Sequence, residues 1–146
     1  RKEITGVGRG RHAYSSFGEG IYTSELTNRI YCLMLERAVE CARMGRKVIV
    51  DATYLKAEQR QDFHETCIAE GLNPFFIHCF AGETVLKDRI RKRMEAGTDV
   101  SDADIAVLEH QLEHLEDPEE LPSYRTLRIN TEDAIHDIVH ALREFL

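Results

Sequence analysis

The sequence lacks tryptophan, has three prolines, and contains no apolar run close to the ~20 residues that a membrane-spanning helix needs. The opening Arg1-Lys2-Glu3-Ile4 has no signal-peptide pattern, so we expect no membrane partner. None of the cysteines forms a C-x-x-C pair, which argues against a disulfide framework. We therefore interpret them as small buried hydrophobes of a protein in the reducing cytoplasm: Cys32, Cys41, Cys67 and Cys79.

A basic excess is also missing, because the formal net charge is −7. The charge is uneven: residues 1–60 carry 11 basic and 7 acidic side chains (+4), whereas residues 101–146 carry 3 and 12 (−9). An acidic whole argues against a nucleic-acid partner, while the basic first part suits a small anion such as phosphate. Apolar residues at 42% are typical of a globular protein, and 146 residues fit one domain, so we expect residues 1–146 to form a single domain.

Apolar spacing indicates an alternation of helices and strands. Helical spacing predicts helices over residues 24–44, 57–70, 83–96, about 101–116, and a last one with Thr131 as its N-cap. Short β-branched and aromatic runs predict strands at 48–50, 75–80 and 127–130. This order is typical of an α/β fold with a parallel sheet, in which the strand at 48–50 would be buried on both faces.

Ligands of open parallel sheets bind at the carboxyl ends of the strands. Asp51 and Thr53 directly follow the predicted strand at 48–50. Asp51 is placed to hold a magnesium ion or its water. It is equally well placed merely to cap or turn the chain, and position alone does not decide between the two.

Two arginines are spaced four apart in the predicted helix 83–96, so Arg89 and Arg93 share one face. Leu86, Ile90 and Met94 form another face, which we expect to face the core. Two guanidinium groups on one face can grip the oxygens of a transferring phosphoryl group and offset its charge. The alternative is a solvated basic face, which is what most charge runs are.

Two further motifs have weaker support. His110-Gln111-Leu112-Glu113-His114 fits the H-x-x-E-H zinc-peptidase pattern, but so short a match favours an ordinary exposed acidic helix. The glycine-rich residues 5–20 follow no predicted strand, and no lysine anywhere in the chain follows a glycine, so the chain has no Walker A motif. We expect this loop to be a flexible flap with Arg9, Arg11 and His12 as candidate substrate contacts.

As a set, these segments resemble one family. Residues 48–55, with Arg60 five residues on, resemble the strand and turn of the zeta-toxin and polynucleotide-kinase-like P-loop kinases. Residues 86–93 resemble the lid helix of these kinases. Residues 101–104, followed by Val107-Leu108 and Gln111, resemble a bacterial subgroup whose members are often fused to an aminoglycoside-phosphotransferase-like domain.

The resemblance implies a three-layer P-loop NTPase-type fold, with helices on both faces of a parallel sheet whose first strands are missing from this chain. It implies ATP and Mg²⁺ as cofactors and transfer of the γ-phosphoryl group to a hydroxylated small-molecule acceptor. Residues 1–47 would supply an acceptor-side loop and helix, and residues 83–117 lid-like helices. Asp51 would support the magnesium ion through water.

The resemblance also implies roles for several other side chains. Arg89 and Arg93 would close over the γ-phosphate as the catalytic pair. Arg1 would contact the acceptor or its phosphate, and Arg60 and Thr53 would help to hold the substrate or the phosphates.

The chain departs from the family because the Walker A loop and the strand before it are absent. In the family that strand lies between the strands at 48–50 and 75–80, so both would lack their inner partner here. We expect this segment alone to bind ATP poorly and to be inactive. One alternative is a nucleotide-sensing or regulatory module without catalysis of its own. Another is an interaction domain whose sheet is completed by a second chain, as in a homodimer.

Overall fold

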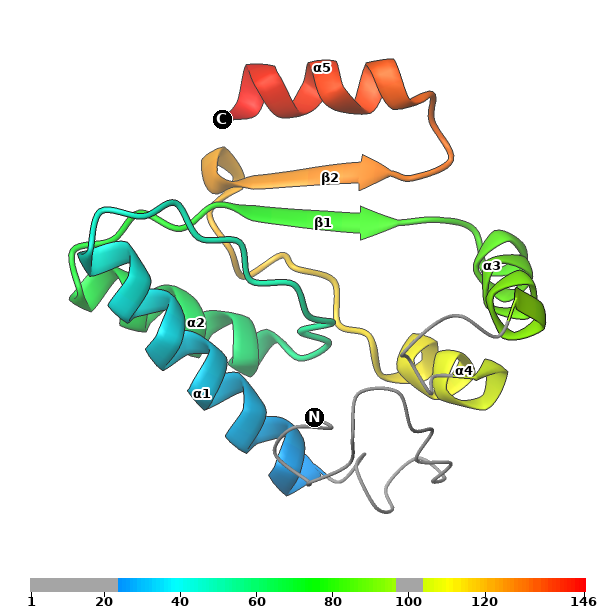
Figure 1. Cartoon of the computed structure of the whole chain (residues 1–146), viewed down its shortest axis with the longest axis horizontal. Coiled ribbons are helices and arrows are strands. Elements are labelled where there is room, and N and C mark those ends of the chain that lie inside the picture. Colours follow the sequence, from blue (N-terminus) through cyan, green and yellow to red (C-terminus); the bar gives the residue numbers. More distant parts are fainter. Residues whose placement is uncertain (1–23, 97–103) are drawn as a thin grey trace. The chain divides into compact units, whose positions relative to one another are not determined.

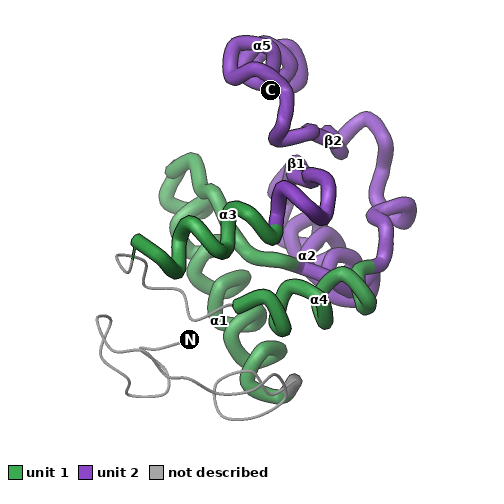
Figure 2. The backbone as a smooth tube through the Cα atoms, turned by 90° about the vertical axis from the view of Figure 1, so that its right-hand side faces the viewer, with its two compact units in different colours: residues 1–53, 87–115 green, residues 54–86, 116–146 purple. Residues whose placement is uncertain are grey.

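The computed structural model describes residues 24–96 and 104–146. Its elements follow in the order α1 (Ser24–Arg43), α2 (Ala57–Ala69), β1 (Phe76–Phe80), α3 (Glu83–Ala96), α4 (Ile105–His114), the 3₁₀ helix η2 (Ser123–Arg125), β2 (Thr126–Asn130) and α5 (Ile135–Phe145) (Figure 1). The chain divides into two compact units (Figure 2). The first holds residues 1–53 and 87–115, and the second holds residues 54–86 and 116–146. The single domain expected over 1–146 stays a prediction.

The second unit contains the sheet. β1 and β2 pair in parallel, with Phe76 opposite Thr126 and Phe80 opposite Asn130. Side chains alternate between the two faces of a strand. Phe76 stacks edge-on with Phe63 of α2 at 6.0 Å between ring centroids, and Phe75, one residue earlier, meets Phe145 of α5 at 5.5 Å. The sheet therefore has a helix on each face, which confirms the α/β fold class with parallel strands and helices on both faces.

The predicted strand at 48–50 is wrong for the described residues. Val48–Val50 form no strand, and Val48 and Ile49 are 40% and 94% exposed instead of buried on both faces. A strand exists only through hydrogen bonds to a neighbour, and β1 and β2 are the whole sheet of the described segments. The β-branched run is therefore left without a partner, although its local preference for a strand is strong.

Glycines end two helices where the sequence predicts. Gly45 after α1 and Gly71 after α2 have φ of +76° and +71°, a left-handed conformation that glycine adopts at little cost. α4 begins with Asp104 as N-cap, whose carboxylate accepts a 2.9 Å hydrogen bond from the Val107 amide. Residues 101–103, at the start of the helix predicted over about 101–116, lie outside the described residues.

The expected N-cap of the last helix is wrong. α5 starts at Ile135, and its N-cap is Ala134, which has no side-chain cap. The Thr131 hydroxyl instead donates to the Phe80 carbonyl oxygen at 3.1 Å, and the Thr131 amide donates to the same oxygen at 2.8 Å. Thr131 therefore ties the end of β2 to the end of β1, because these parallel strands end side by side.

Few apolar side chains are buried in the described part of the chain. They are Ile30, Ala38, Val39, Cys67, Val107, Leu108, Leu121 and Ile129. Among the cysteines, burial is confirmed for Cys67, where it raises the thiol pKa, and is wrong for the exposed Cys32 and Cys79. The core-facing prediction is also wrong for Met94, which is 58% exposed. None of the helices formed by residues 24–96 and 104–146 has the length and apolar character needed to span a bilayer.

Candidate functional site

Asp51 and Thr53 lie in an irregular segment of the first unit, and both side chains are exposed. Thr53 Oγ1 lies 2.9 Å from the Tyr31 hydroxyl of α1, in a hydrogen bond that either hydroxyl can donate. This bond joins the end of the segment to the helix for which we predict an acceptor-side role. Asp51 is a solvated carboxylate beside it, and its role toward magnesium stays a prediction.

α3 carries the two arginines predicted to be catalytic, one turn apart. Arg89 is exposed and Arg93 is half-buried. Within the first unit, Lys87 Nζ of α3 lies 2.7 Å from Glu109 Oε1 of α4. Glu109 is half exposed, so this ion pair between α3 and α4 contributes about 1 kcal/mol or less. The turn-spaced guanidinium groups lie on one helix face and can together bind anionic oxygens.

Arg60, predicted to hold substrate or phosphates, is 6% exposed in the second unit. Its Nε donates to Glu120 Oε1, and its Nη2 donates to Glu120 Oε2 at 3.0 Å and to the Asp117 carbonyl oxygen at 3.2 Å. Its Nη1 donates to the carbonyl oxygen of Tyr54 at 2.8 Å. Tyr54 has φ of +40°, a conformation that costs a non-glycine residue about 1–3 kcal/mol unless its surroundings hold it. Arg60 therefore joins α2 to residues 116–120, which we call the acidic clasp.

A second carboxylate of the acidic clasp caps the start of α2. Glu116 Oε2 accepts from the Ala57 amide at 2.8 Å, and Glu116 Oε1 lies 2.9 Å from Lys56 Nζ. The Glu116 amide donates to the Leu55 carbonyl oxygen at 2.9 Å. The Ala57 hydrogen bond, followed by the one from Lys56, lowers the pKa of Glu116, as the positive end of a helix dipole also favours.

Glu116 and Glu120 were not predicted as functional or structural partners from the sequence. They lie in the acidic run Glu116-Asp117-Pro118-Glu119-Glu120, which has the composition of a solvated segment. Their partners stand about sixty residues earlier, so no local pattern reveals the pairing. Arg60, which lies inside a predicted helix, was the one available signal. If such an arginine is buried against the sheet, it needs a carboxylate partner.

The structure divides the predicted site residues between the two units. Asp51, Thr53, Arg89 and Arg93 belong to the first, and Arg60 belongs to the second. Arg1, the predicted acceptor contact, lies outside the described residues, as do Arg9, Arg11 and His12. The roles toward substrate, phosphate and metal stay predictions.

The residues of the chain fit a magnesium–nucleotide only in part. Arg89 and Arg93 suit phosphate oxygens, and Asp51 suits a hydrated cation. Phosphate binding in P-loop proteins also needs a cradle of backbone amides and a Gly-Lys-Ser/Thr ending, and this sequence has no lysine after a glycine. The sequence therefore offers side chains for phosphate oxygens and for a hydrated cation, but no Gly-Lys-Ser/Thr ending of a Walker A loop.

Comparison with known proteins gives one result. A family model described as "AAA domain" matches residues 1–118, more than three quarters of the chain. The matched stretch includes the 48–53 segment and both arginines of α3, and it ends within the acidic clasp. No curated protein and no solved structure matches the chain.

Proposed function

Because the chain belongs to this AAA domain family of P-loop, nucleotide-binding domains, we propose that it forms part of a kinase-like phosphotransferase. Its substrate would be a hydroxylated small molecule that receives the γ-phosphoryl group of ATP. The observation that carries the proposal is the pair Arg89 and Arg93 on one face of α3, a helix joined to α4 through Lys87 and Glu109. The resemblance to zeta-toxin and polynucleotide-kinase-like enzymes supports transfer to an acceptor.

ATP with Mg²⁺ supplies the transferable phosphoryl group when it is bound. The chain's own contribution would be position and charge, which account for most of the catalysis of phosphoryl transfer. Arg93 and Arg89 would offset the negative charge that spreads over the phosphoryl oxygens. Thr53, held by Tyr31, would present its hydroxyl on the side of α1, where the acceptor would bind.

The phosphate cradle would come from outside residues 1–146. Val48 and Ile49 support this, since a β-branched run directly before Asp51 has the composition of a buried strand and yet is exposed. A strand laid beside it would bury these side chains and satisfy their backbone groups. A further segment or a fused phosphotransferase-like domain could supply that strand together with the cradle, and a second copy of the chain could supply the strand alone.

The proposal is tested by replacing Arg93 in the full-length protein and measuring the conversion of ATP to ADP with Mg²⁺ present. We expect R93A to lower turnover by more than about tenfold, because a guanidinium that stabilises transition-state charge contributes at least that much. The matched control is R91A, since Arg91 lies on the same helix but is 60% exposed and pairs with Asp88 at 3.2 Å. R91A should stay within about twofold of the parent. Equal turnover of R93A and the parent would remove the lid role and favour a nucleotide-sensing module.

A further inference from the structure

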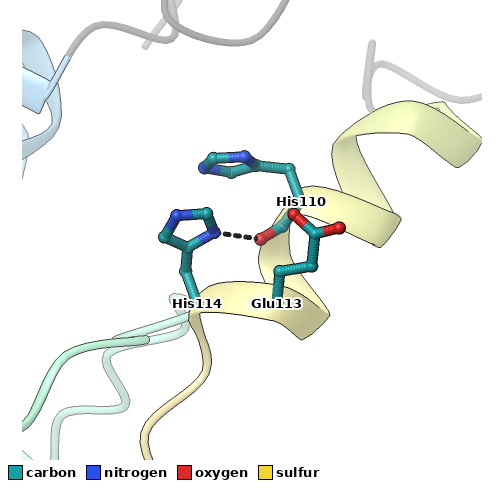
Figure 3. A group of neighbouring side chains, drawn as sticks. All are labelled: His110, Glu113 and His114. Atoms are coloured by element: carbon teal, nitrogen blue, oxygen red, sulfur yellow. Dashed lines mark hydrogen bonds between the residues drawn. The ribbon is translucent and has the colours of Figure 1, made fainter.

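Three potential metal ligands gather at the end of α4. His110 and His114 are one turn apart, and their rings stack with centroids 3.9 Å apart and planes 25° apart. One ligand atom each from His110, Glu113 and His114 lie within 4.8 Å of one another. Figure 3 shows both rings on one side of the helix, with Glu113 rising from the same turn as His114.

A hydrogen bond decides which nitrogen of His114 is available. Its Nδ1 lies 2.8 Å from the backbone carbonyl oxygen of His110. A carbonyl oxygen only accepts, so Nδ1 must carry the proton, and in the neutral ring the lone pair is then on Nε2. Donation from one ring nitrogen to a carbonyl is how metal-bound histidines are oriented, since it fixes the tautomer and makes the other nitrogen more basic.

We propose that His110, Glu113 and His114 form a binding site for a divalent transition-metal ion of the zinc class. Two imidazoles and one carboxylate suit Zn²⁺, Ni²⁺ or Cu²⁺, whereas Mg²⁺ and Ca²⁺ prefer oxygen ligands alone. Three protein ligands are the number that open zinc sites use, with water in the fourth position. The proposal does not depend on the magnesium–nucleotide site of the proposed function, because none of these three residues has a role there.

To bind one ion, the three ligand atoms must move slightly closer together. Ligand atoms bound to one zinc ion at about 2.0–2.2 Å lie roughly 3.3 Å apart. In this structure the three ligand atoms lie within 4.8 Å of one another. Glu113 and His114 are exposed and His110 is half-buried, so rotation of their side chains can close the gap without moving α4. Because both histidines belong to one helix, the bound ion would also hold its last turn together.

The chain offers an internal comparison in α5. His136 and His140 are also four residues apart and exposed, but His136 Nε2 lies 3.1 Å from Asp137 Oδ1. Among the described residues they do not belong to a group of three convergent ligands. The double variant H136A/H140A removes this competing pair and serves as the background for the test.

The test measures Zn²⁺ binding to the H136A/H140A chain by competition with a chromophoric zinc chelator. We expect one zinc ion per chain. H110A and H114A should each weaken binding by roughly 10–100-fold, since loss of a ligand costs at least as much as loss of an outer partner. E113Q should weaken it less, because an amide oxygen can still coordinate the ion. Circular dichroism of each variant without zinc measures whether its helices are retained.

Two outcomes would overturn the proposal. One is a background chain that retains its helices but binds no zinc. The other is an H114Q or E113Q chain, both changed at exposed positions that folding tolerates, whose zinc affinity equals that of the background. Loss of binding in H110A without loss of helicity, together with weaker binding in H114Q, would support the site.

Discussion

Loss of one partner of the Arg60–Glu120 ion pair should strongly destabilise the second unit. The side chains of Arg60 and Glu120 are 7% and 11% exposed, and both carboxylate oxygens accept from the guanidinium. Removing one partner of a buried ion pair leaves a charge without its partner in a poorly solvated place, which typically costs about 3–5 kcal/mol. E120Q and R60A should each lower the free energy of unfolding within that range, with R60A at its upper end.

Arg60 should be the more sensitive position. R60A also takes away the donors that bind the carbonyl oxygens of Tyr54 and Asp117, and the left-handed backbone of Tyr54 loses one of the contacts that hold it. The midpoint of thermal unfolding shifts by about 2–4 °C per kcal/mol for chains near this size, so we expect a decrease of roughly 10 °C or more. Urea unfolding followed by circular dichroism gives the free energy directly.

The matched control is Arg128, which pairs with Asp117 of the same acidic clasp at 3.2 Å. These side chains are 52% and 57% exposed, so R128A should cost about 1 kcal/mol or less. If R60A and R128A destabilised the chain equally, the buried pair would not act as described. A double change to R60M/E120L, which removes both charges together, should cost less than either single change at these positions.

Two further predictions concern pH and thiol chemistry. The hydrogen bond from Arg60 lowers the pKa of Glu120 below its ordinary 4.5, and the one from the Ala57 amide does the same for Glu116. The stabilisation from these carboxylates is therefore fully present above pH 4.5. It is lost as the pH falls through their lower folded-state pKa values. The unfolding midpoint of the parent should therefore fall on acidification below 4.5, and that of E120Q should fall less; parallel curves would contradict this assignment. In thiol labelling at neutral pH, the exposed Cys32 and Cys79 should react quickly and the buried Cys67, whose pKa is raised, slowly; equal rates in the folded chain would contradict the burial.

Features that depend on neighbours in the sequence were predicted well. The helices α1, α2 and α3 follow from apolar spacing, and Gly45 and Gly71 mark two of their ends because these residues adopt positive φ. β1 and β2 follow from short apolar runs, and their alternation with helices was enough to predict a parallel sheet.

Features that depend on distant partners were not predicted. Residues 48–50 have strong β propensity, but a strand also needs a neighbour, and the described sheet provides none there. Arg60 was given a role toward phosphate, and the structure pairs it with Glu120, sixty residues away in an acidic run that resembles solvated surface. Thr131 was expected to cap a helix, but its position at the end of β2 puts the Phe80 carbonyl within reach.

We propose that residues 1–146 contribute the arginines of a P-loop kinase-like site but not its phosphate cradle. Titration of this chain alone with ATP and Mg²⁺, followed by calorimetry, tests it most directly. We predict binding weaker than about 1 mM, since two arginines without the backbone amides of a P-loop give little affinity. Saturable binding at micromolar ATP by the chain alone would contradict the account, because these residues would then hold a complete nucleotide site.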